Sequence, residues 1–167
     1  MAPKVIKTIR ELIYWEYAKL IAEAIDGDRK NYRLVMYTFQ KLRKGEMHPS
    51  AILRENKMLV EEENACAYCG ATEGLEWEHI IPRVKVVIDE IDNMVWACRK
   101  CNAAKGGRDP FEWYGTERQY EIPRLVLGKF LKLAYDLHDR QGTLDSADLN
   151  GDGKLDIFDL AIVVRTE

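Results

Sequence analysis

Apolar residues in the first part of the chain recur at steps of three and four positions, with polar residues between them, which is the pattern of an amphipathic helix. This stripe runs from Lys4 to Ile25 and consists of Ile6, Ile9, Ile13, Tyr17, Leu20 and Ala24. Asp26-Gly27 ends it. Further helices are predicted over about Tyr32 to Arg43 and about Ser50 to Glu62, with Ser50 as an N-terminal cap. Residues 1 to 62 are therefore expected to form a helical region.

Short β-prone segments and turn residues interrupt the helical pattern between residues 64 and 109. Leu75 to Ile81 and Met94 to Cys98 are predicted strands. Asn102 to Lys105 is predicted to open a short helix, which Gly106-Gly107 and then Pro110 break. A compact unit of strand, loop, strand and helix is thus expected within residues 63 to 122.

The helical pattern returns over residues 123 to 138, where the apolar positions are Leu127, Phe130, Leu131, Ala134 and Leu137. A short acidic tail follows, so residues 123 to 167 are predicted to form a C-terminal helix with a small appendage. Helices and strands in this order predict an α+β protein of three parts.

Composition limits the class of protein further. With 167 residues, of which 47% are hydrophobic, the chain can build one domain of ordinary size or one with an appendage. No apolar run approaches the roughly 20 residues of a membrane span, and the N-terminus lacks the apolar core of a secretory signal. We therefore expect a cytoplasmic protein without a membrane partner.

The net charge of −3 conceals an uneven distribution. Residues 136 to 167 hold eight acidic and three basic residues, so residues 1 to 135 carry a net charge of about +2. The acidity of the tail therefore does not argue against a nucleic-acid partner for the rest of the chain.

Four cysteines stand in two CxxC pairs, Cys66 with Cys69 and Cys98 with Cys101. Cytoplasmic reductants keep thiols reduced, and thiolates at this paired spacing are typical zinc ligands. Gly70 and Asn102 follow the pairs closely and let each turn close around an ion. The pattern predicts one structural Zn²⁺ on all four sulfurs.

The segment between the pairs carries the sequence Glu78-His79-Ile80-Ile81-Pro82-Arg83. Asn93 follows His79 after fourteen positions, and Asn102 follows Asn93 after nine. With these residues inside a cysteine frame, residues 66 to 109 resemble the HNH nuclease family. The chain differs from some members in having Gly106 where they carry a further metal-binding His.

The resemblance implies a ββα-metal core and metal-dependent hydrolysis of DNA. It implies that His79 is the general base and that Asn93 orients it. Glu78 and Asn102 would hold the catalytic cation, for which oxygen ligands favour Mg²⁺ or Mn²⁺.

The chemistry of the residues agrees with these roles. Phosphodiester hydrolysis needs an activated water, a cation that stabilises charge on the phosphate, and positive groups that hold the backbone. Histidine titrates near neutrality. Neighbours in a strand point to opposite sides, so Glu78 can face a metal while His79 faces a water across the substrate, provided that the strand is twisted or bulged there. Basic residues near the motif are candidates for phosphate contacts, although a solvated surface also explains them: Arg83, Arg99, Lys100, Lys105 and Arg108.

The acidic tail carries a second motif, the pattern of a twelve-residue calcium loop with Gly153 at the sixth position. Its side-chain ligands would be Asp148, Asn150, Asp152, Asp156 and Asp159, joined by the backbone carbonyl of Lys154. Aspartate instead of glutamate at Asp159 resembles a dockerin repeat, which implies an EF-hand-like appendage that binds Ca²⁺ and a protein partner. Because one loop is visible, a structural calcium clamp is the favoured interpretation and docking onto a partner is the alternative.

Three interpretations of the function remain open from the sequence. The first is an HNH endonuclease acting on DNA with Zn²⁺, Mg²⁺ or Mn²⁺, and Ca²⁺ as its ions. The second is a non-catalytic zinc-ribbon module that binds nucleic acid, and the third is a calcium-dependent adaptor for another protein.

Overall fold

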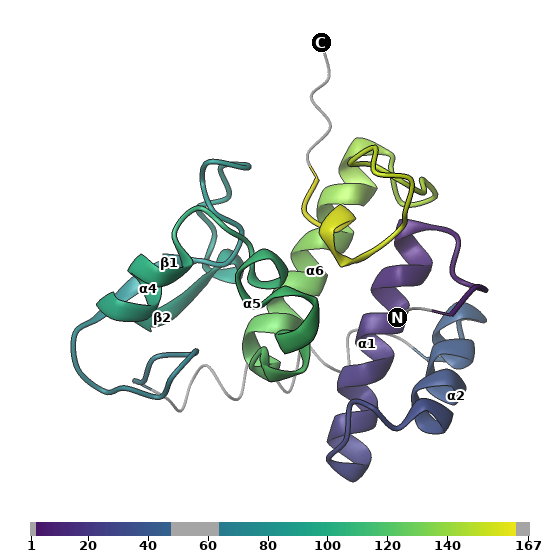
Figure 1. Cartoon of the computed structure of the whole chain (residues 1–167), viewed down its shortest axis with the longest axis horizontal. Helices are drawn as coiled ribbons and strands as arrows, with labels where there is room; N and C mark the ends of the chain where they lie inside the picture. The colour runs from purple at the N-terminus through teal and green to yellow at the C-terminus, as the bar shows by residue number, and fades with distance from the viewer. Residues whose placement is uncertain (1–2, 48–63, 163–167) are drawn as a thin grey trace.

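The computed structural model describes residues 3–47 and 64–162 of the chain (Figure 1). Its elements are α1 (Ile9–Asp26), α2 (Tyr32–Arg43), β1 (Leu75–His79), η1 (Ile91–Asn93), β2 (Met94–Cys98), α4 (Arg99–Lys105), α5 (Pro110–Arg118), η2 (Gln119–Glu121), α6 (Arg124–Gln141) and η3 (Ile157–Asp159). Helices beside a small two-stranded sheet confirm the predicted α+β class. The helix predicted at Ser50 to Glu62 lies outside the described residues.

The hairpin and α4 lie at one end of the molecule, α1 and α2 lie at the other, and α5 and α6 lie between them (Figure 1). Strands β1 and β2 pair antiparallel, with Trp77 opposite Trp96 and Glu78 opposite Val95. Directly opposite residues share a face of the hairpin. One face therefore carries Trp77 and Trp96, and the other carries Glu78 and Val95.

Helix α1 begins and ends where local chemistry favours it. The Thr8 side chain accepts a hydrogen bond from the N–H of Glu11, and Gly27 at φ 83° terminates the last turn. Of the predicted apolar stripe, five residues are buried: Ile6, Ile9, Ile13, Tyr17 and Leu20. Ala24 in the last turn is exposed.

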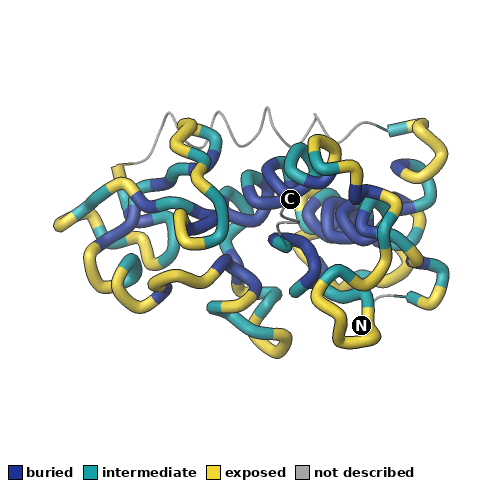
Figure 2. Tube along the Cα trace, turned by 90° about the horizontal axis from the view of Figure 1, so that it is seen from above, coloured by how far each residue is buried: buried dark blue, intermediate teal, exposed yellow. Residues whose placement is uncertain are grey.

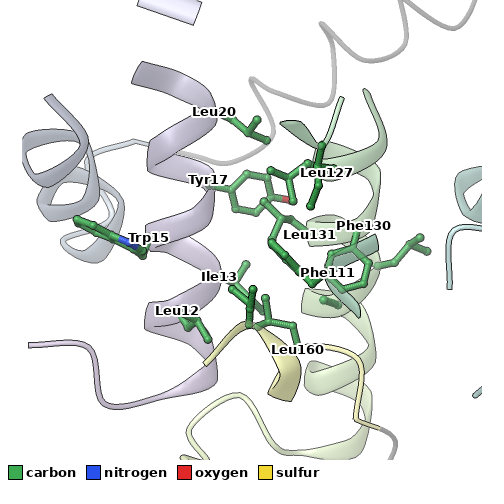
Figure 3. Close-up of a cluster of buried hydrophobic side chains, with 14 of the residues drawn as sticks. Leu12, Ile13, Trp15, Tyr17, Leu20, Phe111, Leu127, Phe130, Leu131 and Leu160 are labelled. Atoms are coloured by element: carbon green, nitrogen blue, oxygen red, sulfur yellow. The ribbon is translucent and has the colours of Figure 1, made fainter. Parts of the chain in front are cut away.

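The main core forms between α1 and α6. Figure 3 shows side chains of α1, Ile13, Tyr17 and Leu20 among them, directed toward Leu127 and Leu131 of α6. Trp15 points the other way, toward α2, where its ring meets Phe39 edge-on at 5.6 Å. Helix α1 is thus packed on both sides. Figure 2 shows the buried segments gathered in the middle of the molecule with exposed loops around them.

The C-terminal tail is attached to this core. Ile157 and Leu160 belong to the buried cluster, and the buried His138 of α6 forms a bond of 2.9 Å from Nε2 to the Leu160 carbonyl. Burial lowers the pKa of His138, which favours the neutral imidazole. Through this bond the tail is joined to α6 at Leu160.

Apolar residues from all three predicted parts of the chain share one buried cluster. Ile80 and Ile81, which were predicted to continue β1, follow it as fully buried residues and join the hairpin to this cluster. The division at residues 62/63 and 122/123 stays a prediction. None of the helices in the described part is long and apolar enough to cross a membrane.

Candidate active site and metal centre

The four cysteines meet in space at one end of the hairpin. Their sulfur atoms all lie within 4.8 Å of one another, and the sulfurs of Cys69 and Cys98 are 3.7 Å apart. A tetrahedral Zn²⁺ with Zn–S bonds of about 2.3 Å separates its sulfurs by about 3.8 Å. The cluster therefore fits one structural zinc ion, as the sequence predicts.

Local backbone geometry forms the two turns that carry these sulfurs. Gly70 at φ 80° closes the first turn, in which its N–H donates to the Cys66 carbonyl at 2.9 Å. Burial raises the pKa of Cys66, but bonds from backbone groups outweigh it and lower the value to about 7. Burial and the neighbouring sulfurs raise the pKa of Cys101. The Cys66 thiolate therefore forms readily next to other thiols. A divalent cation bound among these sulfurs would stabilise the thiolate form.

Asn93 is fully buried and fixes the loop that follows β1. Its side-chain oxygen accepts from the N–H of Ile81 at 2.8 Å, and its amide nitrogen donates to the carbonyls of Ile81 and Ile88 at 3.0 and 2.9 Å. These bonds tie the end of β1 to the far end of the loop. The role of Asn93 in orienting His79 stays a prediction.

Glu78 points into the space between β1 and α4 and is almost fully buried. Lys105 Nζ donates to its Oε1 at 2.6 Å, and the Tyr68 hydroxyl donates to its Oε2 at 2.7 Å. Both carboxylate oxygens thus have protein partners. Tyr68 belongs to the first cysteine turn, so this carboxylate links the cysteine frame to α4.

The prediction that Lys105 contacts a DNA backbone does not fit this geometry. Its side chain is fully buried, and Nζ also donates to the His79 carbonyl at 2.9 Å. Burial lowers the pKa of Lys105, against the opposing effect of Glu78. The sequence showed a base near the motif, but not that the last turn of α4 lies against the acidic face of β1.

Asn102 lies one turn earlier in α4 and meets a different carboxylate. Its Nδ2 donates to Oε1 of Glu76 at 2.7 Å. Glu76 is two positions before Glu78 and therefore lies on the same face of β1. The face toward α4 thus gathers oxygen groups from Glu76, Glu78 and Asn102, which are of the type that Mg²⁺ or Mn²⁺ prefers.

His79 lies on the opposite face of the hairpin from Glu78, as strand alternation predicts. Its imidazole is partly exposed, and Nε2 lies 2.8 Å from Oδ1 of Asp89. The other oxygen of Asp89 accepts from Arg83 at 3.2 Å. Asp89 had no recognisable signal in the sequence, because the contact depends on how the connection between β1 and η1 folds back onto His79.

The remaining predicted phosphate-binding residues lie on the surface near α4. Arg99, Lys100 and Arg108 are exposed, as is Arg83 in the loop after β1. Arg108 also donates to the carbonyls of Ala104 and Lys105 at 2.6 and 3.2 Å and so caps the end of α4. These four positive groups remain candidates for contacts with a nucleic-acid backbone.

The acidic loop of the tail is closed by its own hydrogen bonds. Asp148 accepts from the N–H groups of Gly151, Asp152 and Gly153, the last at 2.7 Å. The buried Asp159 accepts from Leu149, Asn150 and Asp156. Among the described residues, the four cysteines form a group of potential metal ligands whose sulfur atoms lie within 4.8 Å of one another. The carboxylates of the tail do not form such a group of three or more.

Comparison with known proteins gives one match. No curated protein and no solved structure matches the chain. Residues 66–108 match the model of the HNH endonuclease family, over the cysteine frame, β1, β2 and α4, and this likeness indicates nuclease or another nucleic-acid-related activity.

Proposed function

We propose that the protein is a metal-dependent endonuclease that hydrolyses DNA phosphodiester bonds at the hairpin and α4. The observation that carries this proposal is that the two faces of β1 hold different groups. His79 reaches solvent on one face, while oxygen ligands gather on the other against α4, inside a segment that matches the HNH endonuclease family. Because His79 is the last residue of β1, the base and a cation against α4 could reach one phosphate bound at this end of the strand.

His79 is the general base in this proposal. It takes a proton from a water molecule, whose oxygen attacks phosphorus, and the bond from phosphorus to the leaving oxygen breaks. Asn93 keeps the loop after β1 in place, so that the imidazole is held at the end of the strand. A Mg²⁺ or Mn²⁺ ion, when bound, stabilises negative charge on the phosphate and on the leaving oxygen.

Asn102 and Glu78 would hold this cation. The Asn102 amide nitrogen is engaged with Glu76, which leaves its oxygen for a metal. Glu78 would have to exchange a bond with Lys105 or Tyr68 for a bond to the ion. Glu76, with its side chain 43% exposed, is a further carboxylate at the same place. The donors therefore suit a hydrated cation that keeps several of its waters.

Zn²⁺ on Cys66, Cys69, Cys98 and Cys101 would have a structural role. A four-sulfur site is closed and has no position for substrate. The exposed bases Arg83, Arg99, Lys100 and Arg108 would hold the DNA backbone, which gives affinity that decreases with salt.

A plasmid-nicking assay tests the proposal against a zinc module that only binds nucleic acid. Zinc-loaded protein should convert supercoiled plasmid to nicked or linear forms with Mg²⁺ or Mn²⁺ and not with EDTA. Asn102→Ala should need more cation for half-maximal rate, since it removes a ligand. Tight DNA binding without cleavage under any of these conditions would favour the non-catalytic module.

For the tail we propose a structural Ca²⁺ clamp as a second role. The supporting observation is that Asp148 and Asp159 already hold the loop in a turn, with Gly153 at φ 83° at its sixth position. Ca²⁺ would bind Asp148, Asn150, Asp152, Asp156 and Asp159 with the Lys154 carbonyl. A dockerin-like contact with a protein partner is the alternative role, and calcium-dependent association in solution would distinguish it.

A further inference from the structure

The connection between β1 and η1 places a carboxylate on the imidazole of His79. Asp89 Oδ1 lies 2.8 Å from Nε2, which is a normal hydrogen-bond distance. The His79 side chain is 23% exposed and the Asp89 side chain 48%, so the contact lies at the edge of the hairpin with access to solvent. Of the described residues, none bonds Nδ1 of His79.

The position of Asp89 is set by neighbouring bonds. Asn93, itself fully buried, holds the carbonyl of Ile88, the residue immediately before Asp89. The Asp89 carboxylate is held at its second oxygen by Arg83 at 3.2 Å. The loop also turns on itself where the N–H of Lys85 donates to the Pro82 carbonyl at 2.9 Å. Backbone and side chain of Asp89 are thus both fixed toward His79.

Hydrogen-bond chemistry then decides which nitrogen of His79 carries the proton. A neutral imidazole has one N–H donor and one nitrogen lone pair, whereas an ionised carboxylate can only accept. Nε2 must therefore carry the proton that it shares with Asp89. The lone pair is left on Nδ1, which has no partner among the described residues.

We propose that Asp89 is a positioning residue, which holds His79 in the Nε2–H tautomer so that Nδ1 faces the attacking water. This inference rests on the proposed nuclease function. Water gives one proton to Nδ1, its oxygen forms the new bond to phosphorus, and the bond to the leaving oxygen breaks. The leaving oxygen takes a proton from solvent.

Asp89 also acts after the proton has moved. The imidazolium then has N–H groups on both nitrogens, and the one on Nε2 still donates to Asp89. A carboxylate that orients and stabilises an imidazolium acts in the same way in serine hydrolase triads. Because the pair is partly exposed, we expect a smaller effect here, about tenfold in rate.

The test combines ¹⁵N spectra of the histidine rings with cleavage kinetics on the full chain. The chain has three histidines, so assignment is simple. Spectra are recorded near pH 8.5, well above the usual imidazole pKa of about 6.5. His138 is the internal reference, because its Nε2 bonds the Leu160 carbonyl and must be protonated.

The wild-type protein should show a proton on Nε2 of His79 with a ring N–H signal protected from solvent. Asp89→Ala should lose that protected signal and lower kcat about tenfold, with KM changed less than about twofold. Asp89→Asn, whose side-chain oxygen can still accept, should keep the tautomer and recover part of the rate. Asp92→Ala is the matched control, since Asp92 is similarly exposed and pairs with Lys132 instead.

The outcomes separate this inference from the proposed function. A wild-type spectrum with the proton on Nδ1, or cleavage that Asp89→Ala leaves unchanged, overturns the role of Asp89 while the nuclease assignment stands. A wild-type protein that never cleaves DNA overturns the nuclease assignment, and the role of Asp89 in catalysis falls with it.

Discussion

The two ends of the molecule are held together by different means. Helices α1 and α6 bury large apolar side chains against each other, such as Leu20, Leu127 and Leu131. The hairpin end has a small buried cluster of its own, formed by Cys66, Ala97 and Cys98. There the chain relies on four converging sulfurs, on the Asn93 bonds and on the buried pair of Glu78 and Lys105.

The difference explains where the candidate chemistry lies. An apolar core orders residues without specifying the direction of single polar groups, whereas ligation and hydrogen bonds fix individual atoms. The hairpin end has positioned side chains, and it is held by buried polar contacts and by a cysteine cluster that fits a metal ion. Ile80 and Ile81, buried in the main cluster, anchor this end to the helical end.

Zinc removal should have the largest effect, and it should destabilise the hairpin end much more than the helical end. Cys98→Ser removes a ligand but keeps the N-terminal cap of α4, since serine can accept the hydrogen bond that Cys98 Sγ takes from the Cys101 N–H. We expect loss of zinc and a melting temperature lower by about 10 °C, because metal binding supplies folding free energy. Hydrogen exchange should increase over residues 66–105 and stay low over Ile9–Asp26 and Arg124–Gln141.

If Cys98→Ser retained zinc, or if both ends lost protection together, the two ends would not differ as described. Stoichiometric metal analysis of the purified protein provides the matching control.

Asn93→Ala should have the next largest effect and should also act at the hairpin end. It leaves the buried N–H of Ile81 and the carbonyls of Ile81 and Ile88 without their partner. We expect a loss of about 2 to 4 kcal/mol in the free energy of unfolding, measured by urea titration. Asp92→Ala, at the adjacent and more exposed position, should change stability by less than about 1 kcal/mol.

The start of α5 gives a smaller effect that depends on pH. Burial, together with the side-chain hydrogen bond with Glu112, raises the pKa of Asp109 from 3.8 to about 7. A raised carboxyl pKa means that the native state binds the proton of Asp109 more tightly than the unfolded chain does. The resulting contribution to the free energy of unfolding is full below about pH 4 and is lost as pH rises through 7. Burial alone would raise the pKa of Glu112, but its bonds to Asp109 and Lys85 lower it.

Asp109→Asn should remove that pH dependence while keeping the helix cap, because the asparagine oxygen can accept the bond from the Glu112 N–H. The stability of the wild type relative to this variant should decrease between pH 4 and pH 7. A constant difference over that range would mean that Asp109 titrates normally.

Calcium should have the smallest effect, confined to the tail at the helical end. We expect affinity of about 10⁻⁵ to 10⁻³ M, with calcium-dependent protection from proteolysis that Asp148→Ala removes. Zinc content and cleavage should not change. Absence of heat, protection and thermal shift at millimolar Ca²⁺ would leave the loop as a turn closed by its own hydrogen bonds.

Patterns of local origin were predicted well. The bounds of α2 and β2 agree with the sequence analysis, because apolar periodicity and β propensity are properties of short segments. Helix α5 was missed because Pro110 was interpreted as a breaker. In the structure Pro110 is the first residue of α5, after the capping Asp109, where proline is favoured.

The site was predicted in its parts but not in its pairing. Cysteine spacing identified the four sulfurs that meet in space, because that pattern lies in two short segments. The roles assigned to Glu78 and His79 stay predictions. The partners of those residues come from long-range packing: Lys105 on Glu78 and Asn102 on Glu76 depend on how α4 lies along β1. Glu76 could have been found from the two-residue strand period, whereas Asp89 could not.

The cleavage rate of His79→Ala tests the central claim most directly. Zinc-loaded wild type and variant are compared on a labelled DNA duplex with Mn²⁺, with DNA affinity measured in parallel. The account predicts a rate lower by about 10² or more and nearly unchanged affinity, because a general base acts on the water and not on binding. Equal rates for the two proteins, or no cleavage by the wild type with any divalent cation, would contradict it.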